Sequence, residues 1–573
     1  MTRRELLLNA AAVPLMPASD RAIPPINASK IRPDDFADTD LDMPYALSHF
    51  AELANSVVPD GPNRGFIALS VWRGEKNTHP YNARIMESIL TLAWFYTAPQ
   101  KWNQYRGHPT LRARLEWAFD YWCRMQSSDG RFSEYAPQEW NLAATAFAVK
   151  FFSEALRLLK SGPPISAEIH QRAIDACRKA LRVVLFDPGL YRYGCEYSNQ
   201  YTNIFAGGAA FLKLYPDDAL AAQLRKRFEA SSQDLQSPAG YFYEKDGPDL
   251  GYTLDTHHQN VRMAYNYWRD TPFGGMLAEQ ERRFGEWLSF NALPEPGQHF
   301  LVLNRAIESR QKHAIYPALD TPVAERCVIA RAFATTPERR AELIRQARAK
   351  LLQEWPRVDA LEVGNRVALT PYLFLQRSNY DWHPNAEQMA EARKLVRPLN
   401  EPSFVEQRKD TKLPLVFTYV RRPNYYAAFF SVAKPRSTQQ RPGLTLVWTP
   451  RYGVLLQSQT DGMDTAWGTA TADGKPVEAA GLKAEYLDGG AAIRYPIAGG
   501  GQKNVVFAED RIRVTVERPG EIIERVPVFN PACVVSTAHT AVRKQESSPV
   551  PGKKFSVVEL RADGKLEYEI RPS

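Results

Sequence analysis

The chain has 573 residues, 44% of them hydrophobic, which is enough for two domains with large cores and excludes a disordered protein. The formal charge of +8 and the pI of about 9.0 are a modest excess for this length, which permits an acidic polymer as partner without requiring one. No block of Lys and Arg marks a nucleic-acid-binding tail, and no segment after residue 20 is long and apolar enough to cross a membrane. We therefore expect no nucleic-acid partner and no membrane span.

The N-terminus has the pattern of an export signal. Arg3 and Arg4 precede a weakly apolar stretch that runs to Ala18, which resembles a twin-arginine signal, and a short unstructured N-terminus is the alternative. We expect residues 1–20 to be an export signal, residues 21–42 to be an extended lead-in, and the protein to be periplasmic or secreted. The five cysteines are scattered and form no Cys-x-x-Cys pair, so neither a zinc knuckle nor a disulfide scaffold is expected.

Residues 43–395 have the periodicity of helices. Apolar residues recur at helical spacing in many segments, and no alternating strand pattern interrupts them. The clearest expected helices are 81–96, 111–125, 142–159, 167–185, 257–269 and 277–290.

Polar residues occur at nearly equal intervals within this helical region. Asn82, Asn141, Asn199 and His257 are separated by 59, 58 and 58 residues, and His313 follows after 56. Each opens a helical pattern or lies near the start of one, so the period indicates a repeated two-helix unit. If the units form a ring, these side chains converge on one mouth and can line an active site there.

A second repeat supports the first. Residues 125–134 align with residues 235–244, and Gln, Ser, Gly, Phe and Glu match at a spacing of 110 residues. In both copies a helix ends, a turn with glycine follows, and an aromatic residue begins the return. This pattern predicts stacked helical hairpins, of which about six fit into the helical region.

Near residue 396 the pattern changes to short β-rich runs. Gly, Pro and Asp-Gly pairs such as Asp563-Gly564 separate the runs. Short strands with regular turn signals are typical of antiparallel sheets packed as a sandwich. The sequence therefore predicts a helical domain over 43–395 and an antiparallel β-sandwich domain over 396–573.

A helical ring followed by a sandwich resembles the polysaccharide lyases of the chondroitinase, heparinase and alginate-lyase type. The resemblance covers residues 43–573 in architecture, and its motifs are Trp140-Asn141, the segment 197–201 around Asn199 and the segment 251–260 around His257. It implies a multidomain fold, an incomplete (α/α) toroid of about six helical hairpins and then an antiparallel β-sandwich. It also implies cleavage of an acidic, uronate-containing polysaccharide by β-elimination. Such lyases use Asn, His, Tyr and Arg in the toroid cleft, and several add a sandwich histidine, for which His539 has no supporting flanks.

The chemistry of uronate elimination sets three roles. One group neutralises the carboxylate, a second takes the proton at C5, and a third protonates the oxygen that leaves C4. The segment 252–262 offers candidates for all three. We expect Asp255 or Thr256 to cap a helix that starts at His257, whose positive end would keep the imidazole neutral. The predicted catalytic residues are Tyr252, His257, His258 and Asn199. The predicted substrate-binding residues are Asn141, Trp140, Tyr201, Asn203, Arg262, Glu244, Asn82 and His313.

Other interpretations remain open at this point. Each of these polar residues can instead be a helix cap or a packing residue. Loop carboxylates at Glu134, Glu139, Glu244 and Asp249 also suit an inverting or unsaturated-uronide glycoside hydrolase on the same scaffold. A non-catalytic carbohydrate-binding protein is the third interpretation. No cofactor is expected, and a structural calcium ion is allowed although no motif indicates one.

Overall fold

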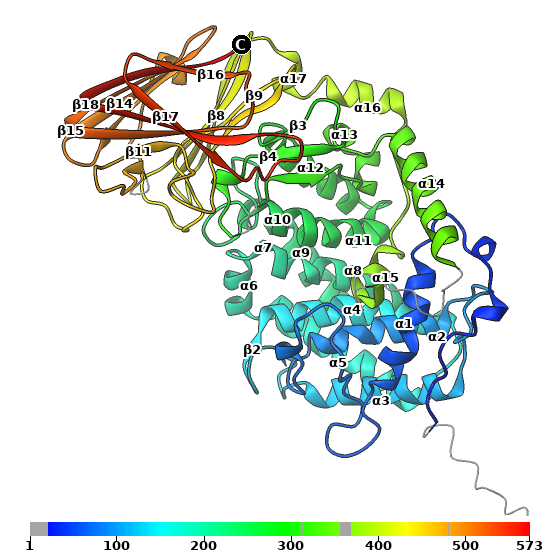
Figure 1. Cartoon of the computed structure of the whole chain (residues 1–573). Coiled ribbons are helices and arrows are strands. Elements are labelled where there is room, and N and C mark those ends of the chain that lie inside the picture. Colours follow the sequence, from blue (N-terminus) through cyan, green and yellow to red (C-terminus); the bar gives the residue numbers. More distant parts are fainter. Residues whose placement is uncertain (1–20, 311–312, 356–367, 479–480) are drawn as a thin grey trace, which may run out of the picture. The chain divides into compact units, whose positions relative to one another are not determined.

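The computed structural model describes residues 21–310, 313–355, 368–478 and 481–573, and Figure 1 follows the chain through its elements. These residues form two compact units. The first unit comprises the chain up to Tyr191, Asn203–Lys226 and Glu338–Asn379, and the second comprises Arg192–Thr202, Arg227–Pro337 and Tyr380–Ser573. The expected export signal, residues 1–20, lies outside the described residues. Among the helices of the described ranges, none has the length and apolar character of a membrane span.

The first unit is mainly helical. Its helices are α1 (Met43–Asn55), α2 (Ile89–Thr97), α3 (Pro109–Met125), α4 (Leu142–Ser161), α5 (Ala167–Phe186), α8 (Asn203–Leu214) and α15 (Pro371–Gln376). Helix α4 packs against α2, α5 and α8. The approach of α8 to α4 depends on Gly207, because a Cβ there would lie 2.6 Å from the backbone nitrogen of Lys150.

The second unit combines helices with the large sheet. Its helices are α7 (Ser198–Tyr201), α10 (Leu250–Tyr252), α11 (His258–Trp268), α12 (Pro272–Leu288), α13 (Val328–Arg331), α16 (Ala386–Arg393) and α17 (Arg397–Asn400), and a π-helical turn (Thr253–His257) joins α10 to α11. Three helices have residues in both units: α6 (Pro188–Gly194), α9 (Asp218–Asp234) and α14 (Pro337–Glu354).

Short strands interrupt the helical region, contrary to the expectation from the sequence. In the first unit, β1 (Phe132–Ser133) pairs with β2 (Trp140–Asn141). In the second, β3 (Ala292–Pro294), β4 (Phe300–Leu303) and β5 (Ile315–Pro317) form a three-stranded antiparallel sheet. Strands of two to four residues are too short for an alternating pattern to be recognised.

The repeated turn predicted from the sequence has the same geometry in both units. In the first unit the Gln126 amide donates to the carbonyls of Gly130 (3.0 Å) and Ala176 (2.9 Å). In the second, the Gln236 amide donates to the carbonyls of Gly240 (2.8 Å) and Gln280 (2.9 Å).

Each turn also touches the following outer helix at the same offset. A Cβ at Gly130 would lie 2.8 Å from the carbonyl oxygen of Lys179, and a Cβ at Gly240 would lie 2.6 Å from that of Arg283. Both contacts fall three residues after the carbonyl that the glutamine binds. Both glycines have positive φ, +104° and +117°, a conformation that other residues rarely adopt. The two-helix repeat is therefore a structural repeat.

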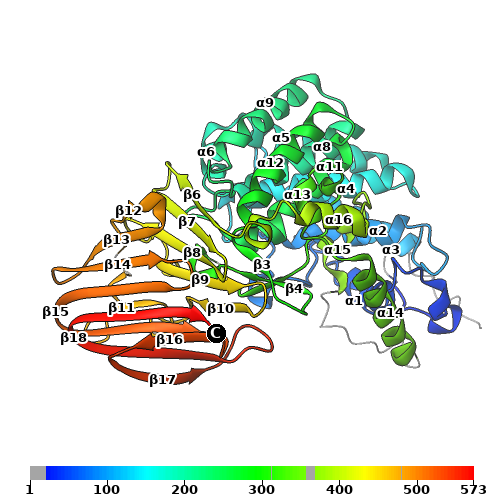
Figure 2. The same ribbon diagram turned by 90° about the horizontal axis from the view of Figure 1, so that it is seen from above.

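Over the described residues, the sheet of the second unit has 13 strands, and the pairings among them are antiparallel (Figure 2). Its strands are β6 (Phe404–Asp410), β7 (Leu415–Arg422), β8 (Tyr425–Val432), β9 (Gly443–Thr449), β10 (Gly453–Gln457), β11 (Gly468–Ala470), β12 (Glu485–Leu487), β13 (Ala492–Ile497), β14 (Gly501–Phe507), β15 (Ile512–Val528), β16 (Cys533–Thr537), β17 (Thr540–Glu546) and β18 (Phe555–Pro572). The main path runs β12-β13-β14-β15-β10-β9-β8-β7-β6, and β18 pairs with β15, β16 and β17. A helical region followed by a large antiparallel sheet is the fold class that the sequence predicts.

One predicted turn is wrong. The Asp563-Gly564 pair, expected to separate two strands, lies inside the single strand β18. Opposite it, β15 shifts register between Glu517 and Glu521, and Gly520 and Gly564 both have positive φ, +79° and +74°. Glycines on both strands let the pair bend at one place without ending, which is the usual role of a bulge.

A buried ion cluster lies within this sheet. The Nζ of Lys503, on β14, is 2.7 Å from a carboxylate oxygen of Glu478 and 2.7 Å from one of Glu524. It also lies 3.6 Å from the ring centroid of Trp467, and the Tyr568 hydroxyl donates to Glu524. Lys503 and Glu524 are completely buried. The cluster connects β14, β15 and β18 through Lys503, Glu524 and Tyr568. Removal of one charged group would destabilise the fold, because its partner would stay buried without a counter-charge.

Candidate functional site

A buried amide and carboxylate pair forms the centre of the first candidate site, in the second unit. The Asn199 side-chain amide donates to Glu244 (2.6 Å), and the Asn199 backbone N–H donates to the other oxygen of the same carboxyl group (2.8 Å). Ser198 Oγ lies 3.3 Å from it as well. Asn199 is 3% exposed and Glu244 is fully buried. The sequence-predicted residues Asn199 and Glu244 thus lie in direct contact.

Two further carboxyl groups surround the start of the next helical segment. Asp249 accepts a hydrogen bond from the backbone N–H of Tyr252 (2.8 Å), and Glu308 accepts one from that of Leu250 (3.0 Å). Burial raises the pKa of Glu244 to about 8, and burial together with the nearby charge of Asp249 raises the pKa of Glu308. At neutral pH Glu244 and Glu308 therefore carry less negative charge than two exposed carboxylates would.

The helix cap expected at Asp255 or Thr256 is wrong. The chain is already helical from Leu250, Asp249 is the N-cap, and the π-helical turn runs through to His257. The buried carboxylate of Asp249 accepts from the Tyr252 N–H and so caps the helix six residues before Asp255. The helix therefore carries Tyr252 on its first turn. Single π-helical turns are rare and frequently occur at functional sites.

Tyr252 and Arg310 form the exposed edge of this site. Tyr252 is partly exposed, and the guanidinium carbon of the exposed Arg310 lies 4.9 Å from the centre of its ring. The loop between β8 and β9 holds this edge in place. Ser437 Oγ donates to the carbonyl of Ser309, and the Gln440 amide donates to the carbonyl of Asp246 (2.8 Å). The sheet thus fixes both segments that flank the carboxyl groups.

The two predicted histidines are buried where the π-helical turn meets α11. His257 is 1% exposed, its ring centroid lies 3.7 Å from that of Phe242, and neither nitrogen has a hydrogen-bond partner among the described residues. Burial lowers the pKa of His257 to about 3, and burial also lowers that of His258, whose Nε2 lies 3.4 Å from Glu281. Both imidazoles are neutral at pH 7, as expected, but burial and not a helix end is the cause.

The other predicted residues of this unit differ in exposure. Arg262 and His313 are partly exposed, and Tyr201 is fully buried. The Nε of Arg262 has no hydrogen-bond partner in the described ranges, and burial lowers the pKa of its guanidinium. The Tyr316 hydroxyl donates to Asp255.

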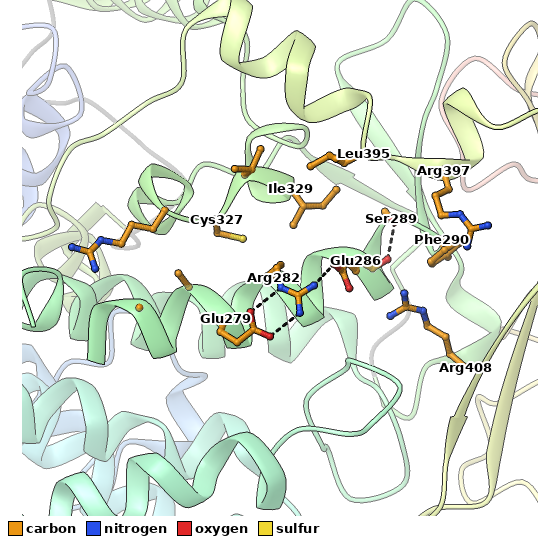
Figure 3. Close-up of a pocket in the computed structure, with 14 residues that line it drawn as sticks. Glu279, Arg282, Glu286, Ser289, Phe290, Cys327, Ile329, Leu395, Arg397 and Arg408 are labelled. Atoms are coloured by element: carbon orange, nitrogen blue, oxygen red, sulfur yellow. Dashed lines mark hydrogen bonds and ion pairs between the residues drawn. The ribbon is translucent and has the colours of Figure 1, made fainter. Parts of the chain in front are cut away.

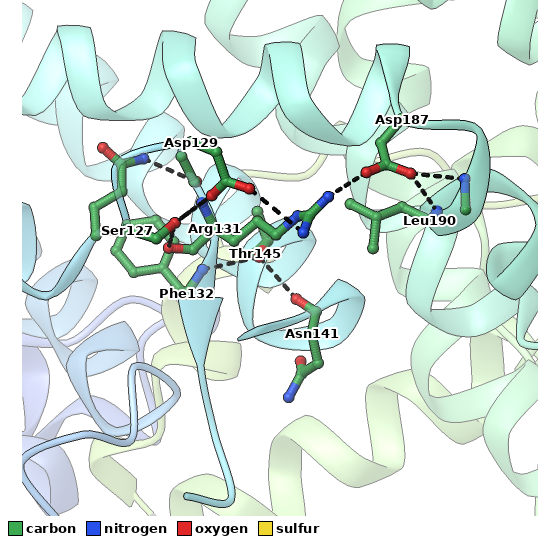
Figure 4. A network of polar contacts seen from close by, with 11 residues as sticks. Ser127, Asp129, Arg131, Phe132, Asn141, Thr145, Asp187 and Leu190 are labelled. Atoms are coloured by element: carbon green, nitrogen blue, oxygen red, sulfur yellow. Dashed lines mark hydrogen bonds and ion pairs between the residues drawn. The ribbon is translucent and has the colours of Figure 1, made fainter. Parts of the chain in front are cut away.

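Four predicted residues belong to the first unit. Asn141 caps α4, where its side chain accepts from the Ala144 N–H (2.8 Å), and its carbonyl accepts from Thr145 Oγ1 (2.7 Å) (Figure 4). Asn82 is 2% exposed and accepts from the Arg84 N–H (3.0 Å). Asn203 begins α8 and is fully buried, and Trp140 is partly exposed on β2. The convergence of these residues with those of the second unit on one mouth stays a prediction.

A charged cluster lies beside Asn82. Arg73 forms an ion pair with Glu134, Arg84 forms one with Glu87, and the Arg84 Nη1 lies 3.8 Å from Glu134. Glu134 and Glu244 are equivalent in the turn repeat, and both are buried against polar partners. In the same unit, burial lowers the pKa of Lys150 to about 7.

A cavity of about 600 Å³ runs along α12 in the second unit (Figure 3). Arg282 lies in its wall and pairs with Glu279 and Glu286, and Arg397 pairs with Glu401 outside it. None of the sequence-predicted site residues lines this cavity, so its size alone does not make it the candidate site.

Sequence reasoning missed Arg310, Glu308 and Glu281. None of the three belongs to the 58-residue period or to the repeated turn, so neither repeat points to them. The nearness of Arg310 to His313 was the one available signal. In the described part of the chain, no group of three or more His, Cys, Asp or Glu side chains is arranged to hold a metal ion.

Comparison with known proteins identifies the fold. No family model matches the sequence, and no curated protein matches it. Among solved structures, a chondroitinase AC lyase studied in oligosaccharide complexes is similar with a TM-score of 0.52 and 13% identity, over 94% of this chain and 83% of that one. A chondroitin AC lyase mutant from Streptomyces coelicolor has a TM-score of 0.52 and 11% identity, over 95% and 79%. Heparinase III has a TM-score of 0.50 and 9% identity, over 96% and 87%. The chain therefore has the fold of the polysaccharide lyases that combine a helical toroid with a β-sandwich.

Proposed function

We propose that the protein cleaves an acidic polysaccharide by β-elimination at the Tyr252 site. The observation that carries the proposal is the pairing of a partly exposed phenol with an exposed guanidinium, in the same unit as a buried amide and carboxyl cluster, on a fold shared with lyases. An elimination needs a proton acceptor and a positive charge beside the uronate carboxylate, and this edge supplies both groups.

Tyr252 is the group that moves protons in this proposal. As the phenolate it takes the C5 proton, and the phenol formed in this way gives that proton to the oxygen that leaves C4. Arg310 binds the uronate carboxylate and stabilises the negative charge that develops when C5 loses its proton. The β8–β9 loop holds the backbone that carries Arg310, because its side chains donate to the carbonyls of Ser309 and Arg310.

The buried cluster supports these two residues. Glu244 holds Asn199 by accepting one hydrogen bond from its side-chain amide and one from its backbone N–H, and Asp249 fixes the first helical turn that carries Tyr252. With pKa values raised by burial, Glu244 and Glu308 add little negative charge below the site, so an anionic substrate is not repelled. The catalytic roles of Asn199, His257 and His258 stay predictions.

The test is incubation with uronate polymers while the near-ultraviolet absorbance of an unsaturated uronate is followed. We expect wild-type protein to produce this absorbance and Tyr252→Phe to lower kcat by about 10²–10⁴-fold, the usual size of a lost general acid or base. Tyr193→Phe is the matched control, because Tyr193 is an exposed tyrosine of the same unit (44%). Equal activity in Tyr252→Phe and Tyr193→Phe would remove Tyr252 from the mechanism.

Glycoside hydrolysis is the second candidate function. The raised pKa of Glu244 favours it, because a carboxyl group that stays protonated near neutral pH can act as a general acid. Products without a new double bond, and activity abolished in Glu244→Gln but retained in Tyr252→Phe, would select hydrolysis. If no polymer is consumed but the polymer binds, the protein is a carbohydrate-binding protein.

We also propose that the protein acts outside the cytoplasm, on the basis of Arg3 and Arg4 in the N-terminal segment. Replacement of both arginines by lysine should keep the protein in the cytoplasmic fraction, and unchanged export would contradict the twin-arginine route.

A further inference from the structure

Gln440, in the loop between β8 and β9, is a buried polar residue to which the proposed mechanism gives no role. It is 1% exposed. Its amide nitrogen donates to the carbonyl of Asp246 (2.8 Å), and its amide oxygen accepts from the backbone N–H of Arg436 (2.9 Å). A buried amide that is bound at both ends fixes the two backbone segments that it joins. Gln440 therefore connects the loop to the turn that contains Asp246.

The turn at Asp246 carries the carboxyl group of Glu244. Residues 244–247 form a tight turn in which the Glu244 N–H donates to the Gly247 carbonyl (3.1 Å). Gly247 has φ +143°, and a Cβ there would lie 2.9 Å from the amide nitrogen of Gln440, so the amide packs directly on the backbone of the turn. The Glu244 carboxyl group holds Asn199. A shift of Gln440 would therefore move the turn and this carboxyl group together.

The same loop holds the segment that ends at Arg310. Ser437 Oγ donates to the carbonyl of Ser309, and the Gln439 amide donates to that of Arg310. Both side chains lie between Arg436 and the buried amide that its N–H binds, so this hydrogen bond closes the part of the loop that contains them. The amide therefore fixes the loop residues that bind the Arg310 segment.

Ser309 joins this segment to the turn. Its N–H donates to the carbonyl of Pro248 (2.9 Å), and its hydroxyl donates to the carbonyl of Glu244 (3.3 Å). Pro248 directly precedes the cap of the helix that carries Tyr252. The loop, the turn, the helix start and the Arg310 segment are thus connected by one set of hydrogen bonds.

We propose that Gln440 is a positioning residue for the elimination, which keeps the backbone of Arg310 and the helix start that carries Tyr252 in the relative placement that the reaction needs. This proposal rests on the proposed function, because only there do Arg310 and Tyr252 have their roles. Gln440 touches no reacting atom and acts through the two backbone segments that it joins. A displacement of about 1 Å between reacting groups can cost about 10²-fold in rate, so the loss of one buried amide is enough to impair the reaction.

The first test compares Gln440→Met with Gln280→Met. Methionine has nearly the length of glutamine but can neither donate to the Asp246 carbonyl nor accept from the Arg436 N–H. Gln280 is the matched control, because it is also buried in the second unit and its amide donates to Ser231 Oγ (2.7 Å). The substrate is chondroitin sulfate or heparan sulfate, whichever the wild-type protein cleaves.

We expect both variants to lower the thermal midpoint by a similar amount, because each loses the hydrogen bonds of a buried amide. In Gln440→Met alone, we expect kcat/KM to fall by about 10²-fold, with most of the loss in kcat, since misplaced groups stabilise the transition state less than the bound substrate. Equal kcat/KM values in Gln440→Met and Gln280→Met would overturn the proposal.

Gln440→Glu gives a signal that a purely structural residue would not produce. The new carboxyl group can accept from the Arg436 N–H at any pH, but it can donate to the Asp246 carbonyl only while it is protonated. We expect kcat/KM of Gln440→Glu, divided by the wild-type value at the same pH, to lie near one in acid. As the pH rises, this ratio should fall toward that of Gln440→Met. A ratio that does not change with pH would contradict the positioning role.

Affinity measurements separate this proposal from the proposed lyase. Titration calorimetry with a chondroitin oligosaccharide, in a Tyr252→Phe background that slows cleavage, should show about tenfold weaker binding after Gln440→Met and unchanged binding after Gln280→Met, because a displaced Arg310 holds the uronate carboxylate less well. Cleavage by the wild type with no effect of Gln440→Met in either assay refutes the positioning role alone.

Binding without cleavage refutes the lyase, and the affinity ratio of the two methionine variants then decides whether Gln440 positions a binding site. A wild-type protein that neither binds nor cleaves these polymers refutes both proposals.

Discussion

The buried imidazole of His257 makes a quantitative prediction about stability and pH. Its pKa falls from 6.5 in the unfolded chain to about 3 in the folded protein because of burial. The folded state therefore favours the neutral ring, so this contribution to stability is complete above pH 6.5 and is lost as the pH falls toward 3. One such group changes the free energy of unfolding by about 1.4 kcal/mol per pH unit in this window, or about 2 kcal/mol between neutral pH and pH 5.

The perturbation that isolates this effect is His257→Phe. Phenylalanine keeps an aromatic ring against Phe242 but cannot take up a proton. We expect the slope of unfolding free energy against pH to fall by about 1.4 kcal/mol per pH unit below pH 6.5, whatever offset the larger side chain adds. His258 keeps a slope of the same sign in the variant, since burial lowers its pKa too.

Urea unfolding at a series of pH values, followed by circular dichroism, measures the slope. The exposed His299 of the same unit gives the control variant His299→Gln, which removes a histidine without changing the buried pair. Identical slopes for wild type and His257→Phe would refute the reasoning, because they would mean that His257 takes up protons equally in the folded and unfolded chains.

Two further predictions concern stability. Gly240→Ala should destabilise the protein by about 2 kcal/mol or more, since φ is +117° and the new Cβ meets the Arg283 carbonyl oxygen at 2.6 Å; Gly275→Ala, in open space on α12, should leave the thermal midpoint unchanged or raise it. Lys503→Met should lower the unfolding free energy by about 3–5 kcal/mol because Glu524 stays buried without its cation, and adding Glu524→Gln should recover part of the loss in the same denaturation assay. Equal midpoints for both glycine variants, or a Lys503→Met protein as stable as wild type, would contradict these two arguments.

The sequence predicted those elements of the fold that leave a regular spacing of apolar residues or turn residues. The helices α4 and α5, the β-rich runs after residue 400 and the repeated turn around Gly130 and Gly240 all follow from spacing, because a helix or strand repeats its buried face at a fixed interval. Glu244 and Asn199 also came from repeats, and the structure brings them into contact.

The rest depends on contacts that are distant in sequence. Arg310 contacts Tyr252 from a loop after β4 that no local pattern connects to it, and Glu308 in the same loop accepts from the Leu250 N–H beside the Asp249 cap. Gly564 was misread as a turn because the glycine opposite it, Gly520, decides that the strand bends without ending. Local chemistry suggested the residue types, and tertiary partners set their roles.

The repeated turn has a consequence for how such a chain can change its length. In each turn one glutamine and one glycine contact the next outer helix. The carbonyl near the glycine lies three residues after the carbonyl that the glutamine binds, in both copies. Each hairpin therefore contains the turn residues that bind the outer helix of the next hairpin. Duplication of a segment between two such turns would produce a longer array whose new junction already fits, whereas an insertion inside a turn would separate the glutamine from its glycine and detach the neighbour.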